Sequence, residues 1–167
     1  MKKKLLLTIL FIGAVLLTGC SKNKSKVSID EFYKKASSEE IQLHDYTSSY
    51  GYAKKAYETE SKEYDILFAE GNNKTDIHGI FFDEARNIYR KLGIDSNTTT
   101  EEPIAGELTT TAAYKKNING GSGWETLEII TQDKYYYLAY VDDTYLYMEG
   151  NIDQKDKLIK LKDSINY

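Results

Sequence analysis

The residues with the chemistry of a hydrolase are few and lie close together in the sequence. The chain has two histidines, and one of them, His44, is followed by Asp45, with Ser48 and Ser49 a few residues later. A Ser-His-Asp site needs a nucleophile, a base and an orienting acid that meet in space. Residues that are adjacent in the sequence do not by themselves form such a site. The chain also has no Gly-x-Ser-x-Gly motif. The pattern therefore favours His44 and Asp45 on opposite faces of a strand, or in a turn, over a catalytic pair.

Oxygen-bearing side chains recur at alternate positions in one polar segment. The spacing of Asp95, Asn97, Thr99 and Glu101 is loosely like that of a calcium-binding loop. Such a loop needs Gly at position six and Glu at position twelve, where this sequence has Thr100 and Gly106. Two histidines without cysteine partners also disfavour structural zinc. We expect neither a metal nor another cofactor.

Carboxylate pairs such as Glu125 and Glu128 could in principle act as general acid and base. Glycoside hydrolysis requires two carboxylates at a set separation across a cleft. A sequence does not show such a separation, and an acidic surface provides similar pairs by accident. We therefore expect that the protein is not an enzyme.

The chain is unusually rich in tyrosine. The segment from Trp124 to Met148 holds six of its fifteen tyrosines. Alternation along a strand would place Tyr135, Tyr137 and Val141 on one face and Tyr136, Leu138 and Tyr140 on the other. We expect one face to be core, and the other to bind a protein or cell-wall glycan through Tyr136 and Tyr140. In the alternative interpretation, cross-strand tyrosine pairs only stabilise the sheet.

The only cysteine, Cys20, follows Leu17-Thr18-Gly19 at the end of a basic and then apolar N-terminus. The apolar run, Leu5 to Leu17, has 13 residues and is too short for a membrane span of about 20 residues. The arrangement resembles a bacterial lipobox, in which the cysteine is lipidated and becomes the mature N-terminus. We expect residues 1–19 to be a signal peptide, residues 20–27 the lipidated Cys20 and a tether, and residues 28–167 a single domain. The lipid on Cys20 would hold the protein on the extracytoplasmic face of the cell membrane.

The mature chain is acidic. Removal of the signal peptide takes away three lysines and no acid, so the formal net charge falls from -4 to -7. Nucleic-acid binding depends on basic patches, so we expect no nucleic-acid partner.

The positions of apolar residues predict the elements of the first half. Ser28 and Glu31 fit a capping box for a helix over 29–37, with Val27 and Phe32 as its hydrophobic staple. Leu43 to Ser48 could be a strand, and Tyr52 to Thr59 a strand or a helical piece. Tyr64 to Glu70 alternates as a strand.

The second half continues with a helix, strands and a last helix. Phe81, Ala85, Ile88, Tyr89 and Leu92 recur at helical spacing. We expect Thr75 or Asp76 to cap that helix at its start and Gly93 at its end.

A Thr-rich strand over 107–117 precedes a three-stranded meander from Trp124 to Met148 that turns at Asp133-Lys134 and Asp142-Asp143. Asp153 can cap a last helix in which Leu158, Leu161 and Ile165 share a face. The resulting class is α+β: a two-layer domain with a mainly antiparallel sheet and about three helices.

The order of these elements and their sequences are similar to those of a known class of proteins. The strand YDILFAE, the helix FFDEARNIYRKLG, the hairpin YYYLAYVDDTYLYMEG and the final helix ending in Tyr167 resemble small surface lipoproteins of Gram-positive bacteria whose function is unknown. The resemblance covers about residues 64–167. It implies surface exposure and a compact α+β domain, and it brings no active residues.

The interpretation that follows is a membrane-anchored surface lipoprotein that acts as a non-enzymatic binding module. One alternative is an accessory or exclusion lipoprotein of a mobile element or phage. A second alternative is an envelope hydrolase, which converging His44 and carboxylates in an open pocket would favour.

Overall fold

The computed structural model describes residues 24–93, 112–119 and 123–167. These residues form a seven-stranded sheet with the order β1-β2-β3-β7-β6-β5-β4, in which every pair of neighbours is antiparallel. The strands are β1 (His44–Asp45), β2 (Ala53–Glu58), β3 (Tyr64–Gly71), β4 (Ala112–Asn119), β5 (Trp124–Thr131), β6 (Lys134–Val141) and β7 (Thr144–Asn151). The described helices are α2 (Ile29–Ser38), α3 (Lys74–Leu92) and α4 (Lys155–Ser164), with the short 3-10 helices η1 (Thr47–Ser49) and η2 (Ile152–Gln154). The predicted α+β class is confirmed.

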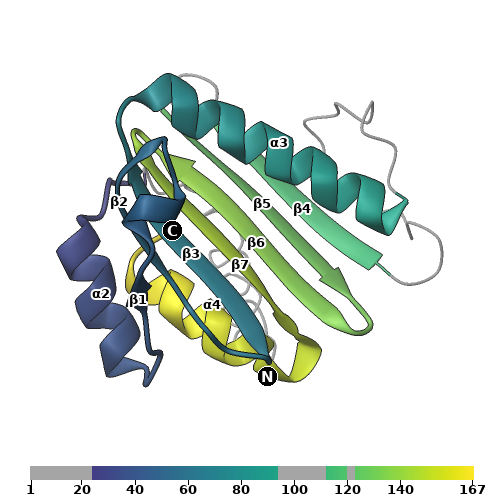
Figure 1. Cartoon of the computed structure of the whole chain (residues 1–167). Helices are drawn as coiled ribbons and strands as arrows, with labels where there is room; N and C mark the ends of the chain where they lie inside the picture. The colour runs from purple at the N-terminus through teal and green to yellow at the C-terminus, as the bar shows by residue number, and fades with distance from the viewer. Residues whose placement is uncertain (1–23, 94–111, 120–122) are drawn as a thin grey trace, which may run out of the picture.

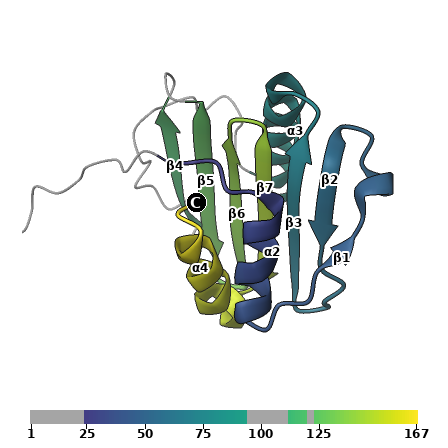
Figure 2. The ribbon, with the colours of Figure 1, turned by 90° about the vertical axis from the view of Figure 1, so that its left-hand side faces the viewer.

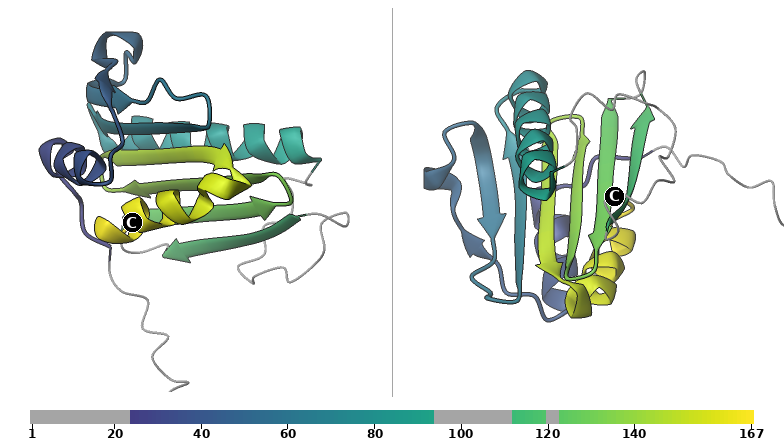
Figure 3. Two further views of the ribbon diagram at one scale, coloured as in Figure 1. Left: turned by 90° about the horizontal axis from the view of Figure 1, so that it is seen from below. Right: turned by 90° about the vertical axis from the view of Figure 1, so that its right-hand side faces the viewer.

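The helices lie on both faces of the sheet. Helices α2 and α4 cover one face, and α3 covers the other (Figures 1 and 2). From the opposite side, α3 lies in front of the strands (Figure 3, right). The two-layer arrangement is therefore wrong, because the domain has three layers. The reason lies in β6, which is apolar on both faces and can bury them only if both are covered.

The N-terminal helix α2 begins as its capping pattern predicts. The Glu31 amide donates a 3.2 Å hydrogen bond to the Ser28 hydroxyl, and Val27 and Phe32 are buried in the same core. Val27 is thus part of the fold instead of part of the tether. The domain begins slightly earlier than residue 28.

Strand β2 settles the ambiguity in the first half. Residues 53–58 are extended and pair with β3, so the helical alternative is wrong. Alanine and lysine favour helix on intrinsic propensity, but pairing with the buried strand β3 outweighs that weak preference. Strand β1 is only two residues long and forms an edge of the sheet.

Helix α3 presents the predicted apolar face to the sheet. Its buried side chains are those of Ile77, Phe81, Ala85 and Ile88. It ends at Gly93, whose φ of 68° is the left-handed conformation expected of a C-cap. Its N-cap is Asn73 instead of Thr75 or Asp76. The Asn73 side chain accepts a 2.9 Å hydrogen bond from the Asp76 amide, so the helix starts directly after β3.

The meander of β5, β6 and β7 forms as predicted, with its second turn at Asp142-Asp143. The first turn is at Gln132-Asp133 instead of Asp133-Lys134, because Lys134 already pairs as the first residue of β6. Tyr135 and Tyr137 of β6 face α2 and α4, whereas Tyr136, Leu138 and Tyr140 face α3. The Thr-rich strand corresponds to β4, and residues before 112 lie outside the described ranges.

The C-terminal helix α4 packs through the predicted face, because Leu158 and Leu161 are fully buried and Ile165 nearly so. Asp153 does not cap it. Residues 152–154 form η2 first, and the α4 N-cap is Gln154, which makes no capping side-chain bond.

Candidate functional site

The face that α3 covers carries a pocket beside this helix, over β2, β3 and β7. Its volume is about 250 Å³. We name it the tyrosine–carboxylate pocket after its lining, which consists of Tyr50, Tyr52, Tyr145, Tyr147, Glu58, Asp65, Glu84, Leu67 and Ile80.

Strand alternation and register bring the floor of the pocket together. Asp65 and Leu67 alternate with the buried residues of β3, and Tyr147 of β7 is the cross-strand partner of Leu67. Glu58 of β2 pairs with Leu67 from the other side. One face of three adjacent strands thus supplies a carboxylate, a tyrosine and an apolar residue side by side.

Helix α3 and the η1 region supply the walls. Ile80 and Glu84 are four residues apart on α3 and therefore share a face of the helix. Tyr50 and Tyr52 precede β2, and their rings lie 5.5 Å apart. The Tyr50 hydroxyl donates a 2.7 Å hydrogen bond to Glu58, which fixes that carboxylate at the pocket wall.

No cation among the described residues neutralises the carboxylates of the pocket. Within the described ranges, no lysine or arginine forms an ion pair with Glu58, Asp65 or Glu84. Asp65 keeps contact with water. Partial burial of its carboxyl group nevertheless raises its pKa to about 6, and the negative charge of Glu58 adds to the rise. The pocket is therefore an acidic site at neutral pH.

The phenols of the pocket stay neutral. Burial and the nearby carboxylates Glu58 and Glu84 raise the pKa of Tyr52 to about 12. Burial also raises the pKa of Tyr145 well above its usual value, and Glu84 adds to the rise. These hydroxyl groups can therefore donate and accept hydrogen bonds but do not ionise at physiological pH.

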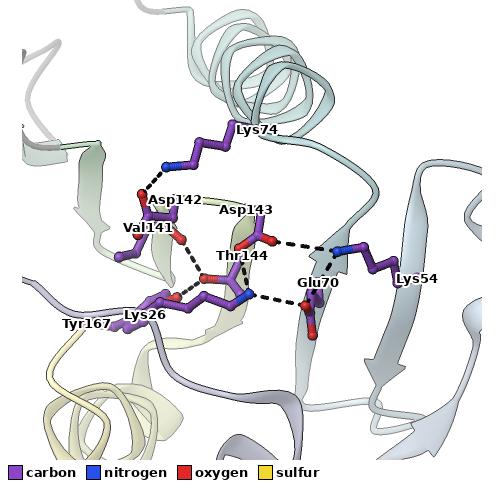
Figure 4. Close-up of polar contacts among 9 residues, drawn as sticks. All are labelled: Lys26, Lys54, Glu70, Lys74, Val141, Asp142, Asp143, Thr144 and Tyr167. Atoms are coloured by element: carbon purple, nitrogen blue, oxygen red, sulfur yellow. Dashed lines mark hydrogen bonds and ion pairs between the residues drawn. The ribbon is translucent and has the colours of Figure 1, made fainter.

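A second polar cluster lies at the β6–β7 turn, and its charges are balanced (Figure 4). The Lys26 ammonium lies 2.7 Å from a carboxylate oxygen of Asp143 and 3.1 Å from one of Glu70. Lys54 lies 3.8 Å from both acids. Burial of Asp143 opposes its ionisation, but the hydrogen bond and charge of Lys26 outweigh it and hold its pKa below the usual value.

The same turn also ties down the C-terminus. Thr144 donates a 2.7 Å hydrogen bond to the Val141 carbonyl and shares a hydrogen bond with the hydroxyl of Tyr167. Lys74 of α3 pairs with Asp142 of the turn. This cluster joins both ends of the described chain to the sheet, and we assign it a structural role.

The predicted contact residues Tyr136 and Tyr140 are buried, at 1% and 7% exposure. Both lie beneath α3, so the open aromatic face they required is not present among the described residues. His78 of α3 lies against Tyr140, with ring centroids 4.0 Å apart.

His44 is exposed and lines a separate open groove of about 490 Å³ together with Glu40. Asp45 is instead held by Lys55 and Thr47. In the described part of the chain, no hydrogen bond or ion pair joins His44 to a serine or a carboxylate.

The pair Glu125 and Glu128 is divided by the sheet. Glu125 accepts from Tyr140 on the α3 face, and Glu128 accepts a 2.8 Å hydrogen bond from Tyr135 on the other. Cys20 and the calcium-like segment 95–101 lie outside the described residues. No three His, Cys, Asp or Glu side chains within the described ranges are grouped so that they could hold a metal ion.

Sequence reasoning did not identify the tyrosine–carboxylate pocket. One signal was available: Tyr145 and Tyr147 alternate on β7, as Asp65 and Leu67 do on β3, so each pair shares a face. Which strand pairs with which, and which face α3 covers, follows only from the tertiary structure.

Comparisons with known proteins provide no family for this chain. No protein-family model matches it, and no curated protein is significantly similar to it in sequence. Within the described ranges, no helix has the length and apolar character needed to cross a membrane.

Proposed function

We propose that this protein is a lipid-anchored, extracytoplasmic binding module that holds its partner in the tyrosine–carboxylate pocket. The lipobox at Cys20 and the resemblance to surface lipoproteins support the anchor and the location. The acidic charge of the mature chain supports a partner other than a nucleic acid.

The observation that carries the proposal is a concave site whose polar groups are only partly satisfied. Carboxylates balanced by lysines, as at the β6–β7 turn, are typical of structural contacts. The carboxylates around Asp65 have no such partner in the described chain and line an aromatic pocket, which is the composition of a ligand site.

The anchor and the pocket are tested separately. Cys20→Ala should abolish incorporation of a radioactive fatty acid into the protein in growing cells. Equal labelling of the wild type and the variant would rule out lipidation at this residue.

The pocket is tested by blocking it. Leu67→Trp fills the pocket whatever the charge of its ligand, so it should abolish photo-crosslinking of the protein to its partner on intact cells. Tyr33→Trp is the control, because Tyr33 is exposed at a different groove. If Leu67→Trp captured the same partner as the wild type, the binding site would lie elsewhere.

A second candidate function is the envelope hydrolase, and Asp65 is the observation that favours it. A carboxyl group with a pKa of about 6 beside other carboxylates is the arrangement of a general acid with a base. Turnover of purified cell-wall material that is lost in Asp65→Asn would establish this function in place of simple binding.

A further inference from the structure

We propose that the group bound in the tyrosine–carboxylate pocket is a primary ammonium or guanidinium group, either on a small free amine or on a basic side chain of a peptide. This inference rests on the proposed binding function and names the chemical class of its ligand. It stands on charge, on one hydroxyl group of a buried tyrosine that makes no hydrogen bond to the described residues, and on the size of the pocket.

The first observation is the uncompensated charge. Glu58, Asp65 and Glu84 come from β2, β3 and α3 and surround one pocket without an internal cation among the described residues. A bound ammonium or guanidinium group would supply the missing positive charge and make charge-assisted hydrogen bonds, which are about twice as strong as neutral ones.

The second observation is Tyr145, which is independent of the acidic residues. Its side chain is 1% exposed and lines the pocket. Its hydroxyl group makes no hydrogen bond to any described residue. The hydroxyl oxygen is not fully enclosed, so it is open to the pocket and can accept a hydrogen bond from an N–H donor of the ligand. Burial raises the pKa of this phenol, and the neighbouring residues Glu84, Tyr147 and Tyr52 raise it further. All three neighbours line the same pocket.

The third observation is the shape and lining of the pocket. Its volume of about 250 Å³ lies just below the range of about 300–1,000 Å³ for drug-sized ligands, so it suits a side chain or a short amine. Tyrosine rings attract cations through their faces. The carboxylates are spread around the pocket and are not grouped as metal ligands, which favours an organic cation with several N–H donors.

Calorimetric titration of the mature chain with three probes tests this inference. The probes are 1,5-diaminopentane, the end-blocked peptide Gly-Lys-Gly, and the same peptide with Nε-acetyl-lysine, which keeps the shape and loses the charge. We expect the lysine peptide to bind and its acetylated form to bind at least about tenfold more weakly. Binding of the diamine as well would identify a free amine as sufficient, whereas binding of the peptide alone would identify a peptide side chain as the source.

Variants link this binding to the pocket. Asp65→Asn with Glu84→Gln should weaken lysine-peptide binding at least about tenfold, because two charge-assisted contacts are lost. Tyr145→Phe should weaken it several-fold while the melting temperature stays unchanged, since no intramolecular hydrogen bond is removed. Glu63→Gln is the control, because it removes one charge outside the pocket.

Two results would overturn the inference. One is equal binding of the lysine and acetyl-lysine peptides, and the other is absence of binding by both amines at millimolar concentration. Loss of crosslinking in Leu67→Trp, with crosslinking retained in Asp65→Asn/Glu84→Gln, would reject the cationic ligand and leave the proposed binding function standing. Retained crosslinking in Leu67→Trp would reject that function itself.

Discussion

Asp65 of β3 and Glu149 of β7 stand directly opposite one another in the sheet, on the face that α3 covers. Glu149 is well compensated: Lys91 and Lys134 each lie 3.2 Å from it, and the Tyr147 hydroxyl donates a 2.8 Å hydrogen bond to it. Asp65 has no such partner among the described residues, and like charges directly opposite in a sheet are destabilising.

Replacement of Asp65 should therefore stabilise the protein. We expect Asp65→Asn to raise the free energy of unfolding at pH 7.5 by about 0.2–1 kcal/mol, as measured by urea denaturation. Glu63→Gln, which removes a charge whose side chain makes no polar contact with the described residues, should change it less. A lower urea midpoint in Asp65→Asn would mean that the carboxylate is stabilising.

The same carboxylate should make this gain depend on pH. Its pKa is raised to about 6 by burial and by the acids that face it: Glu58, Glu149 and Glu84. The folded protein thus holds this proton more tightly than the unfolded chain, so the stability contributed by Asp65 falls as the pH rises from about 4 to about 6. The difference between Asp65→Asn and the wild type should be near zero at pH 3.5 and reach its full value above pH 6.5.

The buried tyrosines of β6 should behave as core residues. Tyr136→Ala or Tyr140→Ala should each lower the stability by about 3–5 kcal/mol, the range for removal of a buried aromatic side chain. Circular dichroism during thermal unfolding measures this loss. Tyr33→Ala, at an exposed position, is the comparison. A double variant of Tyr136 and Tyr140 with an unchanged melting temperature would show that α3 does not cover them.

The docking of α4 depends on Leu161, which is fully buried. Leu161→Ala should cost about 2–5 kcal/mol because it removes apolar contact and leaves a cavity. Leu161→Met preserves the volume and should cost less than about 1.5 kcal/mol. Equal urea midpoints for the two variants would argue against tight packing of the helix on the sheet.

The ion pairs of Lys26 should make a salt-sensitive contribution. Lys26→Met should lower the stability by up to about 1 kcal/mol at pH 7 and low salt, and by less in 1 M NaCl, where screening is strong. Because the folded pKa of Asp143 is depressed, this contribution is present above the unfolded pKa and is lost as the pH falls through the folded value. Lys54→Met, with longer contacts of 3.8 Å, should have a smaller effect. A Lys26→Met effect that persists in salt would point to packing instead of charge.

The elements that sequence reasoning predicted well are those that local patterns determine. Ser28 and Glu31 are three residues apart, and the apolar positions from Phe81 to Ile88 mark one face of a helix. Local patterns misled where tertiary contacts dominate. The alanines and lysines of residues 53–58 favour helix on intrinsic propensity. The segment is nevertheless a strand, because its pairing with the buried strand β3 outweighs that preference.

The pocket was beyond the reach of local patterns. Tyr50, Asp65, Glu84 and Tyr145 come from four separate segments of the chain: the connection between η1 and β2, strand β3, helix α3 and strand β7. Their meeting depends on the pairing of β3 with β7 and on the face chosen by α3. Both are set by packing between distant segments, which the spacing of residues along the chain does not reveal.

The pairing of β3 with β7 also sets the order in which the molecule can be completed. Strand β3 (Tyr64–Gly71) precedes its partner β7 (Thr144–Asn151) by a long segment that includes α3, β4, β5 and β6. Until the ribosome has made β7, one edge of β3 has no strand beside it, and an unpaired edge can associate with other chains. Contacts between distant segments also form slowly. The centre of the sheet therefore cannot close until β7 has been made, because β7 is the strand that lies between β3 and β6.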